Sequence, residues 1–256
     1  MKVSIVIPTY KRADYLDRLL TSIQVQTFQD FEVIVVDDNS PNYEEYLAVV
    51  EKYKNIFSEF KFITKAENKG APNSRNIGIK EAKYDLIALV DDDDEWLPLK
   101  LEKQVEVFSN NNEKVGLVYT WTNVMDESRK IVYQYRSDLE GFLKEDILRE
   151  CFIPSPSVMV RKNAIVEVGL FDESFPSCQD WDMWTRIIIR GYEVKVVKEV
   201  VTIYHKHNNG NIGLSKNAKN GYSKYYAKHK KSIILYGHYS AKIILIKYMI
   251  KRCLFV

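Results

Sequence analysis

Short apolar runs alternate with amphipathic helical segments over the first 120 residues of this 256-residue chain, and this rhythm constrains the fold more than any other feature. Because the runs are mostly apolar and several are stopped by proline or acidic residues, strands are predicted over 3–7, 31–36, 60–64, 86–90 and 115–120. Apolar residues at helical spacing predict helices over 14–25, 43–53, 72–83 and 99–108. Such strand–helix–strand repeats form right-handed units around a mainly parallel sheet.

The regular alternation of strand and helix patterns ends after residue 120, and the patterns that follow predict a smaller mixed region. Extended polar segments over 121–135 are followed by short strands over 157–160, 193–197 and 200–204 and by helices over 163–168 and 180–189. No linker long enough to separate independent domains interrupts this part of the chain. We therefore expect one α/β unit over 1–217, with halves 1–120 and 121–217, and a separate tail over 218–256.

Charge is distributed unevenly, although the formal net charge is only +2. No Asp or Glu follows Glu199, so residues 200–256 carry ten Lys and one Arg, whereas the remainder has 26 basic and 35 acidic residues. This asymmetry favours an anionic partner for the tail, such as membrane headgroups, a phosphorylated lipid or nucleic acid. A pair of basic helices packed on the body explains the same composition, and the apolar stretch over 243–255 is too short to span a bilayer.

The most acidic segment, Asp91–Glu95, directly follows the strand predicted over 86–90. Adjacent carboxylates repel one another, so five of them at a strand end predict a compensating cation. In an extended turn Asp91 and Asp93 point to the same side and leave coordination positions open, which suits Mg²⁺ or Mn²⁺ shared with a substrate diphosphate. A solvated acidic turn at the start of a helix is the alternative interpretation.

A second acidic pair, Asp37 and Asp38, ends the strand predicted over 31–36. Because ligands bind beyond the carboxyl ends of parallel strands, this pair and the Asp91–Glu95 segment are expected at one functional edge. A carboxylate there can accept the N3–H of uracil or thymine. Asx-turn and helix-cap roles are the competing interpretation, since Asp, Asn and Ser favour both.

A third segment, Gln179–Trp184, begins a predicted helix. Asp180 and Asp182 are two residues apart, so on a helix they face different directions, and we place Asp180 at the exposed helix start. The two tryptophans of this segment share one face and are predicted to pack in the core. Weaker candidates are Arg75, which can reach a diphosphate, and His207, which can help bind a metal or a phosphate.

The absence of two phosphate-binding motifs and the spacing of the cysteines limit the protein classes and the compartments that are possible. The chain contains neither GxGxxG nor GxxxxGK[ST], which excludes a dinucleotide phosphate loop of that type and a P-loop ATPase. The three cysteines lie far apart and form no CxxC pair, which favours a reducing compartment. We therefore expect a cytoplasmic protein.

Five segments in order over residues 3–207 carry a family resemblance: Val3–Tyr10, Gln26–Phe28 before 31–40, Asn68–Asn76, Asp91–Pro98, and Gly169–Glu173 with Asp180–Trp184. Together they resemble the family-2 glycosyltransferases of the GT-A fold. The resemblance implies a Rossmann-like α/β sheet flanked by helices, with a nucleotide-sugar-binding half over 1–120, a smaller mixed acceptor-binding half over 121–217 and a basic helical C-terminal tail.

The resemblance also implies roles for individual residues. The nucleotide would contact Pro8, Thr9, Tyr10, Asp38, Arg75, Asp91 and Asp92, with Thr9 and Asp38 at the pyrimidine base. Asp93 would bind the metal ion and Asp180 would be the catalytic base, and the candidate His207 from the sequence pattern is taken as a further metal ligand. Two positions depart from the family pattern: Lys11 stands where Asn is frequent, and Gln179 stands where Glu often precedes the catalytic Asp.

The implied activity is inverting, metal-dependent transfer of a sugar from a nucleotide-diphosphate sugar, with UDP as the expected nucleotide and Mn²⁺ or Mg²⁺ as the cofactor. The expected acceptor is a glycan or a polyprenyl-diphosphate-linked hydroxyl in surface polysaccharide assembly, such as capsule or O-antigen. The enzyme would be cytoplasmic or peripheral on the inner face of the membrane, and no nucleic-acid partner is expected. The alternatives are a sugar-nucleotide nucleotidyltransferase, which needs a glycine-rich loop near the N-terminus, and a nucleic-acid-binding module that uses the tail.

Overall fold

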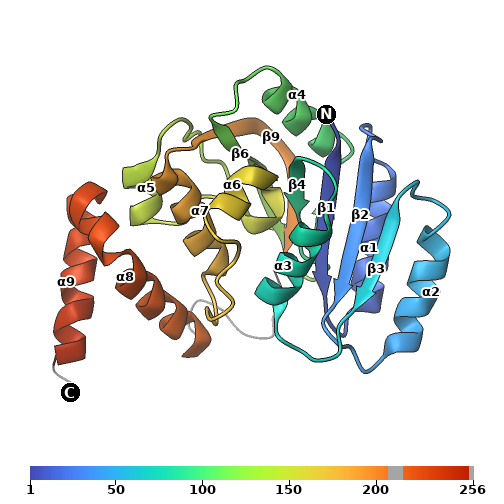
Figure 1. Ribbon diagram of the computed structural model, residues 1–256, viewed down its shortest axis with the longest axis horizontal. Coiled ribbons are helices and arrows are strands. Elements are labelled where there is room, and N and C mark those ends of the chain that lie inside the picture. Colours follow the sequence, from blue (N-terminus) through green and yellow to red (C-terminus); the bar gives the residue numbers. More distant parts are fainter. Residues whose placement is uncertain (207–215, 254–256) are drawn as a thin grey trace.

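A computed structural model describes residues 1–206 and 216–253 of the chain. In this part of the chain one sheet runs in the order β3-β2-β1-β4-β8-β6-β9-β5, and β7 pairs with β6. Figure 1 shows β3, β2, β1 and β4 side by side. The strands are β1 (Val3–Thr9), β2 (Phe31–Asp37), β3 (Phe60–Thr64), β4 (Leu86–Leu89), β5 (Glu95–Trp96), β6 (Val115–Met125), β7 (Ile131–Tyr135), β8 (Met159–Arg161) and β9 (Glu193–His205). The helices are α1 (Ala13–Gln24), α2 (Tyr43–Tyr53), α3 (Ala71–Glu81), α4 (Lys100–Ser109), α5 (Lys144–Arg149), α6 (Lys162–Glu167), α7 (Gln179–Arg190), α8 (Lys216–Tyr236) and α9 (Tyr239–Cys253).

The first four strands form the parallel part of the sheet, as the sequence rhythm predicts. Thr9 at the end of β1 pairs in register with Asp37, which in turn pairs with Thr64, so the three carboxyl ends lie at one edge. Residues of β1 alternate between two cores: Ile5 and Ile7 pack with α1, α2 and α4, whereas Val6 packs with α3 and the second half of the chain. Helices therefore cover both faces, and the polar segments after the strands share one open edge.

The second half joins the sheet through antiparallel strands. Strand β8 lies antiparallel between β4 and β6, and β9 runs parallel to β6. The two short strands predicted over 193–197 and 200–204 are wrong as separate elements, because Glu193–His205 forms one strand whose register against β6 shifts near Trp121. The sequence analysis also misses β5 and α5, which are short and carry little periodicity.

The C-terminal tail is a pair of helices, of which α8 packs against α5 and α7 and α9 lies at the outer edge of the molecule (Figure 1). Tyr225 and Ile233 of α8 and Leu245 of α9 are buried in the larger of the two cores. The packing that the sequence left as an alternative for this tail is therefore present. Within the described residues, no helix combines the length and the apolar character needed to cross a membrane.

Candidate active site

A cavity of about 310 Å³ opens at the carboxyl edge of the parallel strands. Every described residue that the sequence assigns to the nucleotide or the metal lines it: Pro8, Thr9, Tyr10, Asp38, Arg75, Asp91, Asp92 and Asp93. They come from four separate stretches of sequence, namely the ends of β1 and β2, the first turns of α3 and the segment after β4. The fold thus brings the candidate residues together, while His207 lies outside the described residues.

Asp92 accepts hydrogen bonds that join the acidic segment after β4 to the end of β1. Thr9 Oγ1 donates to Asp92 Oδ2 at 2.7 Å, and the backbone N–H of Tyr10 donates to the same oxygen at 3.4 Å. Burial and the neighbouring Asp93 carboxylate raise the pKa of Asp92 to about 7. Asp92 therefore fixes the position of the Thr9 side chain in the lining of the cavity.

Arg75 supplies positive charge to the cavity from the buried side of α3. One guanidinium nitrogen, Nη2, donates to Asp91 Oδ1, and the guanidinium carbon lies 5.4 Å from the centre of the Phe171 ring. The other terminal nitrogen, Nη1, is buried and has no hydrogen-bond partner among the described residues. A buried donor without an acceptor is costly, so this nitrogen is suited to an anion that enters the cavity.

Arginine side chains neutralise the acidic segment in this structure. Arg12 Nη1 bonds to Asp93 and lies 3.3 Å from Asp92 Oδ1, and Arg18 Nη2 donates to the Asp93 backbone oxygen at 2.5 Å. Glu95 is paired with Arg18, Arg129 and His205. Guanidinium groups thus contact four of the five adjacent carboxylates for which the sequence analysis expects a divalent cation, whereas Asp94 accepts the backbone N–H of His205.

The donor set still suits a hard cation. Asp91 and Asp93 both face the cavity and offer carboxylate oxygens, the ligands that Mg²⁺ and Mn²⁺ prefer. Residues 1–206 and 216–253 contain no cluster of three or more His, Cys, Asp or Glu side chains that could hold a metal alone. An ion on Asp93 would therefore complete its shell with substrate oxygens and water, and would compete with the partly exposed Arg12.

Asp38 lines the cavity but is already engaged on both oxygens. Its Oδ1 accepts from Lys65 Nζ at 2.5 Å and from the Lys69 N–H at 2.9 Å, and its Oδ2 accepts from the Gly70 N–H at 2.7 Å. Gly70 has φ +83, a left-handed conformation that suits glycine. Asp38 therefore fixes the turn that starts α3, and a role in reading a base would come in addition to this.

Asp180 lines a second cavity of about 460 Å³, which shares Asp91, Gln179 and Tyr204 with the first. Its Oδ1 accepts the Trp181 N–H at 2.8 Å at the start of α7. A helix N-terminus lowers an aspartate pKa, but burial outweighs this hydrogen bond and the nearby Arg75, so the pKa of Asp180 is raised. A carboxylate of raised pKa beside an open cavity is suited to accept a proton.

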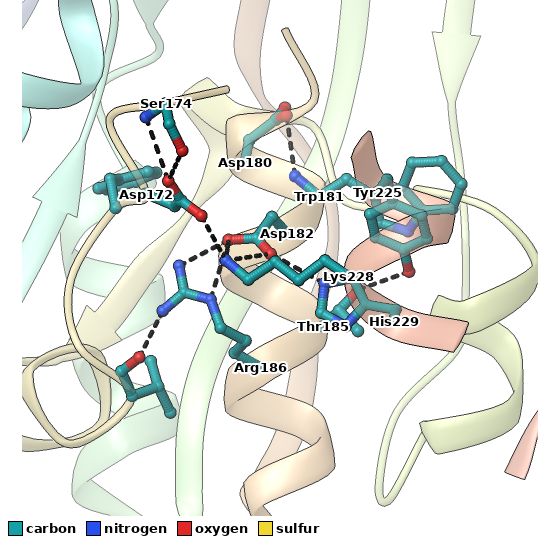
Figure 2. Close-up of polar contacts among 12 residues, drawn as sticks. Asp172, Ser174, Asp180, Trp181, Asp182, Thr185, Arg186, Tyr225, Lys228 and His229 are labelled. Atoms are coloured by element: carbon teal, nitrogen blue, oxygen red, sulfur yellow. Dashed lines mark hydrogen bonds and ion pairs between the residues drawn. The ribbon is translucent and has the colours of Figure 1, made fainter. Parts of the chain in front are cut away.

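Asp182 points away from Asp180, as the helical spacing predicts, and toward three basic side chains (Figure 2). Its fully buried carboxylate contacts Arg186 Nε at 2.9 Å, Lys228 Nζ at 2.9 Å and His229 Nε2 at 2.8 Å. Lys228 also reaches Asp172, at 2.8 Å. Because Lys228 and His229 lie on α8, this cluster joins the tail to the helix that carries Asp180.

Further contacts hold α8 against the segment before Asp180. The Trp181 and Tyr225 rings stack with centroids 3.8 Å apart, which confirms that Trp181 is a packing residue. A Cβ at Gly221 would lie 2.6 Å from the backbone oxygen of Ser177, so no larger residue fits there without movement. Residues 218–236, which the sequence analysis assigns to the tail over 218–256, therefore pack closely on α7 and on the segment before it.

Several cavity residues were missed by the sequence analysis. Arg12 and Tyr204 line the first cavity, and Tyr135 and Cys151 line the second. Arg12 follows the β1 loop that the sequence singled out, so its position was a usable signal. The others come from strand ends and loops after residue 120, where no motif marks them.

The chain matches the profile of the family described as glycosyl transferase family 2 over residues 4–175. It is 32% identical over 227 residues to an uncharacterized glycosyltransferase, MJ1057, of Methanocaldococcus jannaschii, with 88% of this chain and 77% of that protein covered. It is 33% identical over 216 residues to an uncharacterized glycosyltransferase, YwdF, of Bacillus subtilis, with 80% and 74% covered. A Rickettsia bellii relative is longer, and the chain spans 27% of it.

Solved structures show the same fold at lower identity. The S. aureus TarS 1–349 structure in complex with UDP-GlcNAc has a TM-score of 0.76 and 21% identity, with 97% of this chain and 72% of that chain covered. The mannosyltransferase PcManGT from Pyrobaculum calidifontis, in complex with GDP-Man and Mn²⁺, has a TM-score of 0.68 and 17% identity, with 90% and 64% covered. Both likenesses support a GT-A-type fold.

Proposed function

Since this chain belongs to glycosyl transferase family 2 and is therefore a sugar-transferring enzyme, we propose that it moves a sugar from a UDP-sugar to a hydroxyl group with inversion at the anomeric carbon. The observation that carries the proposal is the pair of adjoining cavities. One holds Arg75 and the acidic segment, the other holds Asp180, and Asp91, Gln179 and Tyr204 line both.

The first cavity suits the nucleotide diphosphate. The unpartnered Nη1 of Arg75 would donate to a phosphate oxygen, and Thr9 and Tyr10 would line the nucleoside end. Binding of UDP-GlcNAc by TarS and of GDP-Man by PcManGT supports a nucleotide-sugar donor here. Asp38 can accept the N3–H of uracil if the ion pair between Lys65 and Asp38 opens.

In the proposed reaction, Asp180 takes the proton of the acceptor hydroxyl as its oxygen attacks the anomeric carbon. The bond from that carbon to the diphosphate oxygen breaks, and its electron pair leaves with the nucleotide diphosphate. Attack occurs from the face opposite the leaving group, so a single displacement inverts the configuration. Arg75 stabilises the negative charge that develops on the diphosphate.

A divalent cation would be held by Asp93, with Asp91 oriented toward the same space, and His207 is proposed as an additional ligand. When bound, Mn²⁺ or Mg²⁺ supplies neutralisation of the departing diphosphate. PcManGT was solved with Mn²⁺, which supports metal dependence. Arg12 would release Asp93 when the metal and the donor enter.

The second cavity would receive the acceptor. Its described lining holds tyrosine, proline, serine and cysteine side chains beside Asp180, a surface on which a sugar ring can lie. We propose a glycan or a polyprenyl-diphosphate-linked acceptor in surface polysaccharide assembly, reached on the cytoplasmic side of the membrane.

Release of UDP from UDP-sugars in the presence of Mn²⁺ or Mg²⁺ tests the proposal. Asp180→Asn should lower turnover by about 10²–10⁴-fold while donor binding persists, because the base is lost and the donor cavity is intact. Asp93→Ala should lower turnover and remove the response to metal. Glu199→Ala, which removes an exposed acid on the surface, serves as the matched control and should retain activity. Full activity in both site variants would refute the assignment.

A further inference from the structure

The helical hairpin α8–α9 carries apolar side chains on its outside. Leu235 and Tyr239, at the turn between the two helices, are 70% and 75% exposed. Exposed apolar residues also include Ile234, Tyr236, Ile244 and Ile246. An apolar group of this kind on one side of a protein marks an interaction surface.

The apolar residues of α9 differ from those of an ordinary surface helix, because they occupy two opposite faces. On the inward face, Ala241 and Leu245 are buried against the rest of the protein. Tyr239 and Ile246, which are exposed, and Ile243, which is half-buried, recur at i, i+7 and i+4 on the opposite face. The helix is therefore apolar on both sides, and only one of them is covered by this chain.

Lysines border this outer face and no acid lies on either helix. Lys230 and Lys231 of α8 precede the turn, and Lys242 and Lys247 of α9 flank the apolar stripe. Lysine stems lie along apolar surface while the ammonium groups remain at the polar boundary. Apolar residues bordered by lysines are the pattern of helices that lie in the interface of a membrane with anionic lipids.

We propose that this hairpin surface, defined as Lys230, Lys231 and Ile234–Tyr236 together with Tyr239, Lys242, Ile243, Ile246 and Lys247, docks on the surface of an anionic lipid bilayer. A second copy of the chain is disfavoured, because a two-fold contact would place the same lysines against one another. Nucleic acid would satisfy the lysines but would leave the apolar stripe exposed. A bilayer can bind both the lysines and the apolar stripe, since anionic headgroups contact the lysines and acyl chains contact the apolar residues.

Docking would also fix the active site relative to the membrane. The inner side of α8 is joined to α7 through the Asp182 cluster (Figure 2). In addition, Lys224 Nζ donates to the Ser174 backbone oxygen at 2.8 Å. The hairpin surface and Asp180 therefore belong to one rigid arrangement. The proposal concerns membrane contact and does not depend on which sugar is transferred.

Flotation of the full chain with vesicles tests the proposal. We expect binding to phosphatidylcholine vesicles that contain phosphatidylglycerol, weaker binding to pure phosphatidylcholine, and loss of binding at high salt. The double variant Tyr239→Glu/Ile246→Glu should lose binding. The matched control Ile131→Glu/Val132→Glu, which places the same charges at exposed apolar positions of β7, should bind like the wild type.

The lysines are tested separately from the apolar stripe. Each of Lys242→Gln and Lys247→Gln should weaken partitioning onto anionic vesicles by about five-fold. Thermal unfolding of all variants should match the wild type, because the substituted side chains lie outside the buried face. UDP release in solution should be unchanged in the hairpin variants, so a failure of docking is distinguishable from a failure of the proposed function.

Three results would overturn the proposal. The first is wild-type protein that does not float with anionic vesicles. The second is concentration-dependent dimerisation that Tyr239→Glu/Ile246→Glu abolishes, which would assign the surface to a second copy. The third is oligonucleotide binding that competes with vesicles and is lost in the lysine variants, which would assign it to nucleic acid.

Discussion

Replacement of Asp182 by asparagine is expected to loosen the joint between α7 and α8. The buried carboxylate contacts Arg186, Lys228 and His229 at 2.8–2.9 Å, and the variant leaves the cationic Arg186 and Lys228 without this negative partner. Breaking a buried pair typically costs about 3–5 kcal/mol. Lys228 keeps Asp172 and is 31% exposed, so we expect the lower end, about 3 kcal/mol. For a chain of this length that corresponds to a fall in Tm of roughly 6–12 °C.

Urea denaturation followed by tryptophan fluorescence measures this change, since Trp181 and Trp184 lie on α7. The matched control is Asp172→Asn, which removes a partly exposed acid from the same lysine and should cost about 1 kcal/mol or less. Burial alone would raise the pKa of Asp182, but His229, Arg186 and Lys228 outweigh it and lower that pKa. The stabilisation is therefore present above the unfolded pKa and is lost as pH falls through the folded pKa, so the two proteins should converge in acid. Equal stability of Asp182→Asn and the wild type at neutral pH would refute the reasoning.

Three further predictions address the rest of the site. Asp92→Asn should gain stability relative to the wild type as pH rises between 3.8 and about 7, because the raised folded pKa makes ionisation of the native carboxylate unfavourable; thermal unfolding across that range checks it, and a constant difference would contradict it. Arg75→Met should weaken UDP binding in calorimetry by about ten-fold or more, since one charge-assisted hydrogen bond is lost, and unchanged affinity would remove Arg75 from the donor site. Gly221→Ala should lower Tm and UDP release together, because its Cβ would meet the Ser177 backbone; a variant with wild-type values would show that α8 does not constrain Asp180.

Much of the parallel half of the fold could be predicted from the sequence because most of its strands are buried on both faces. Val3–Thr9 and Phe31–Asp37 are buried throughout and largely apolar, and the structure places them close to the expected bounds. Phe60–Thr64 at the edge of the sheet is only partly buried. The second half could not be resolved in the same way. Strand β9 contains Lys198 and Glu199 at its middle, and this charged pair gave the appearance of two strands.

The nucleotide-side residues were predictable because the carboxyl ends of parallel strands meet at one edge. That rule places the acidic residues after β2 and those after β4 at the same edge, whereas Thr9 is assigned only through the family resemblance. It does not say which partner neutralises each acid. The pairing of Arg12 with Asp93 depends on tertiary contacts over 81 residues of sequence, and local patterns carry no signal for it.

The link between α7 and α8 was hidden for a similar reason. Lys228 and His229 appear in the sequence as members of a basic tail, and only their contact with Asp182, across more than 45 residues, gives them a role in the body. The helical spacing did predict that Asp180 and Asp182 face different ways. What it could not show is that Asp182 faces a helix from the end of the chain.

The most direct test of the central claim is a crystal structure of this protein with UDP and Mn²⁺. The account predicts the diphosphate between Arg75 and Asp93, with the metal on the Asp93 carboxylate and Arg12 displaced from it. Asp180 should face the same space from the start of α7, across the boundary of the two cavities. UDP bound elsewhere on the molecule, or bound in this cavity with its phosphates directed away from both Arg75 and Asp93, would contradict the account.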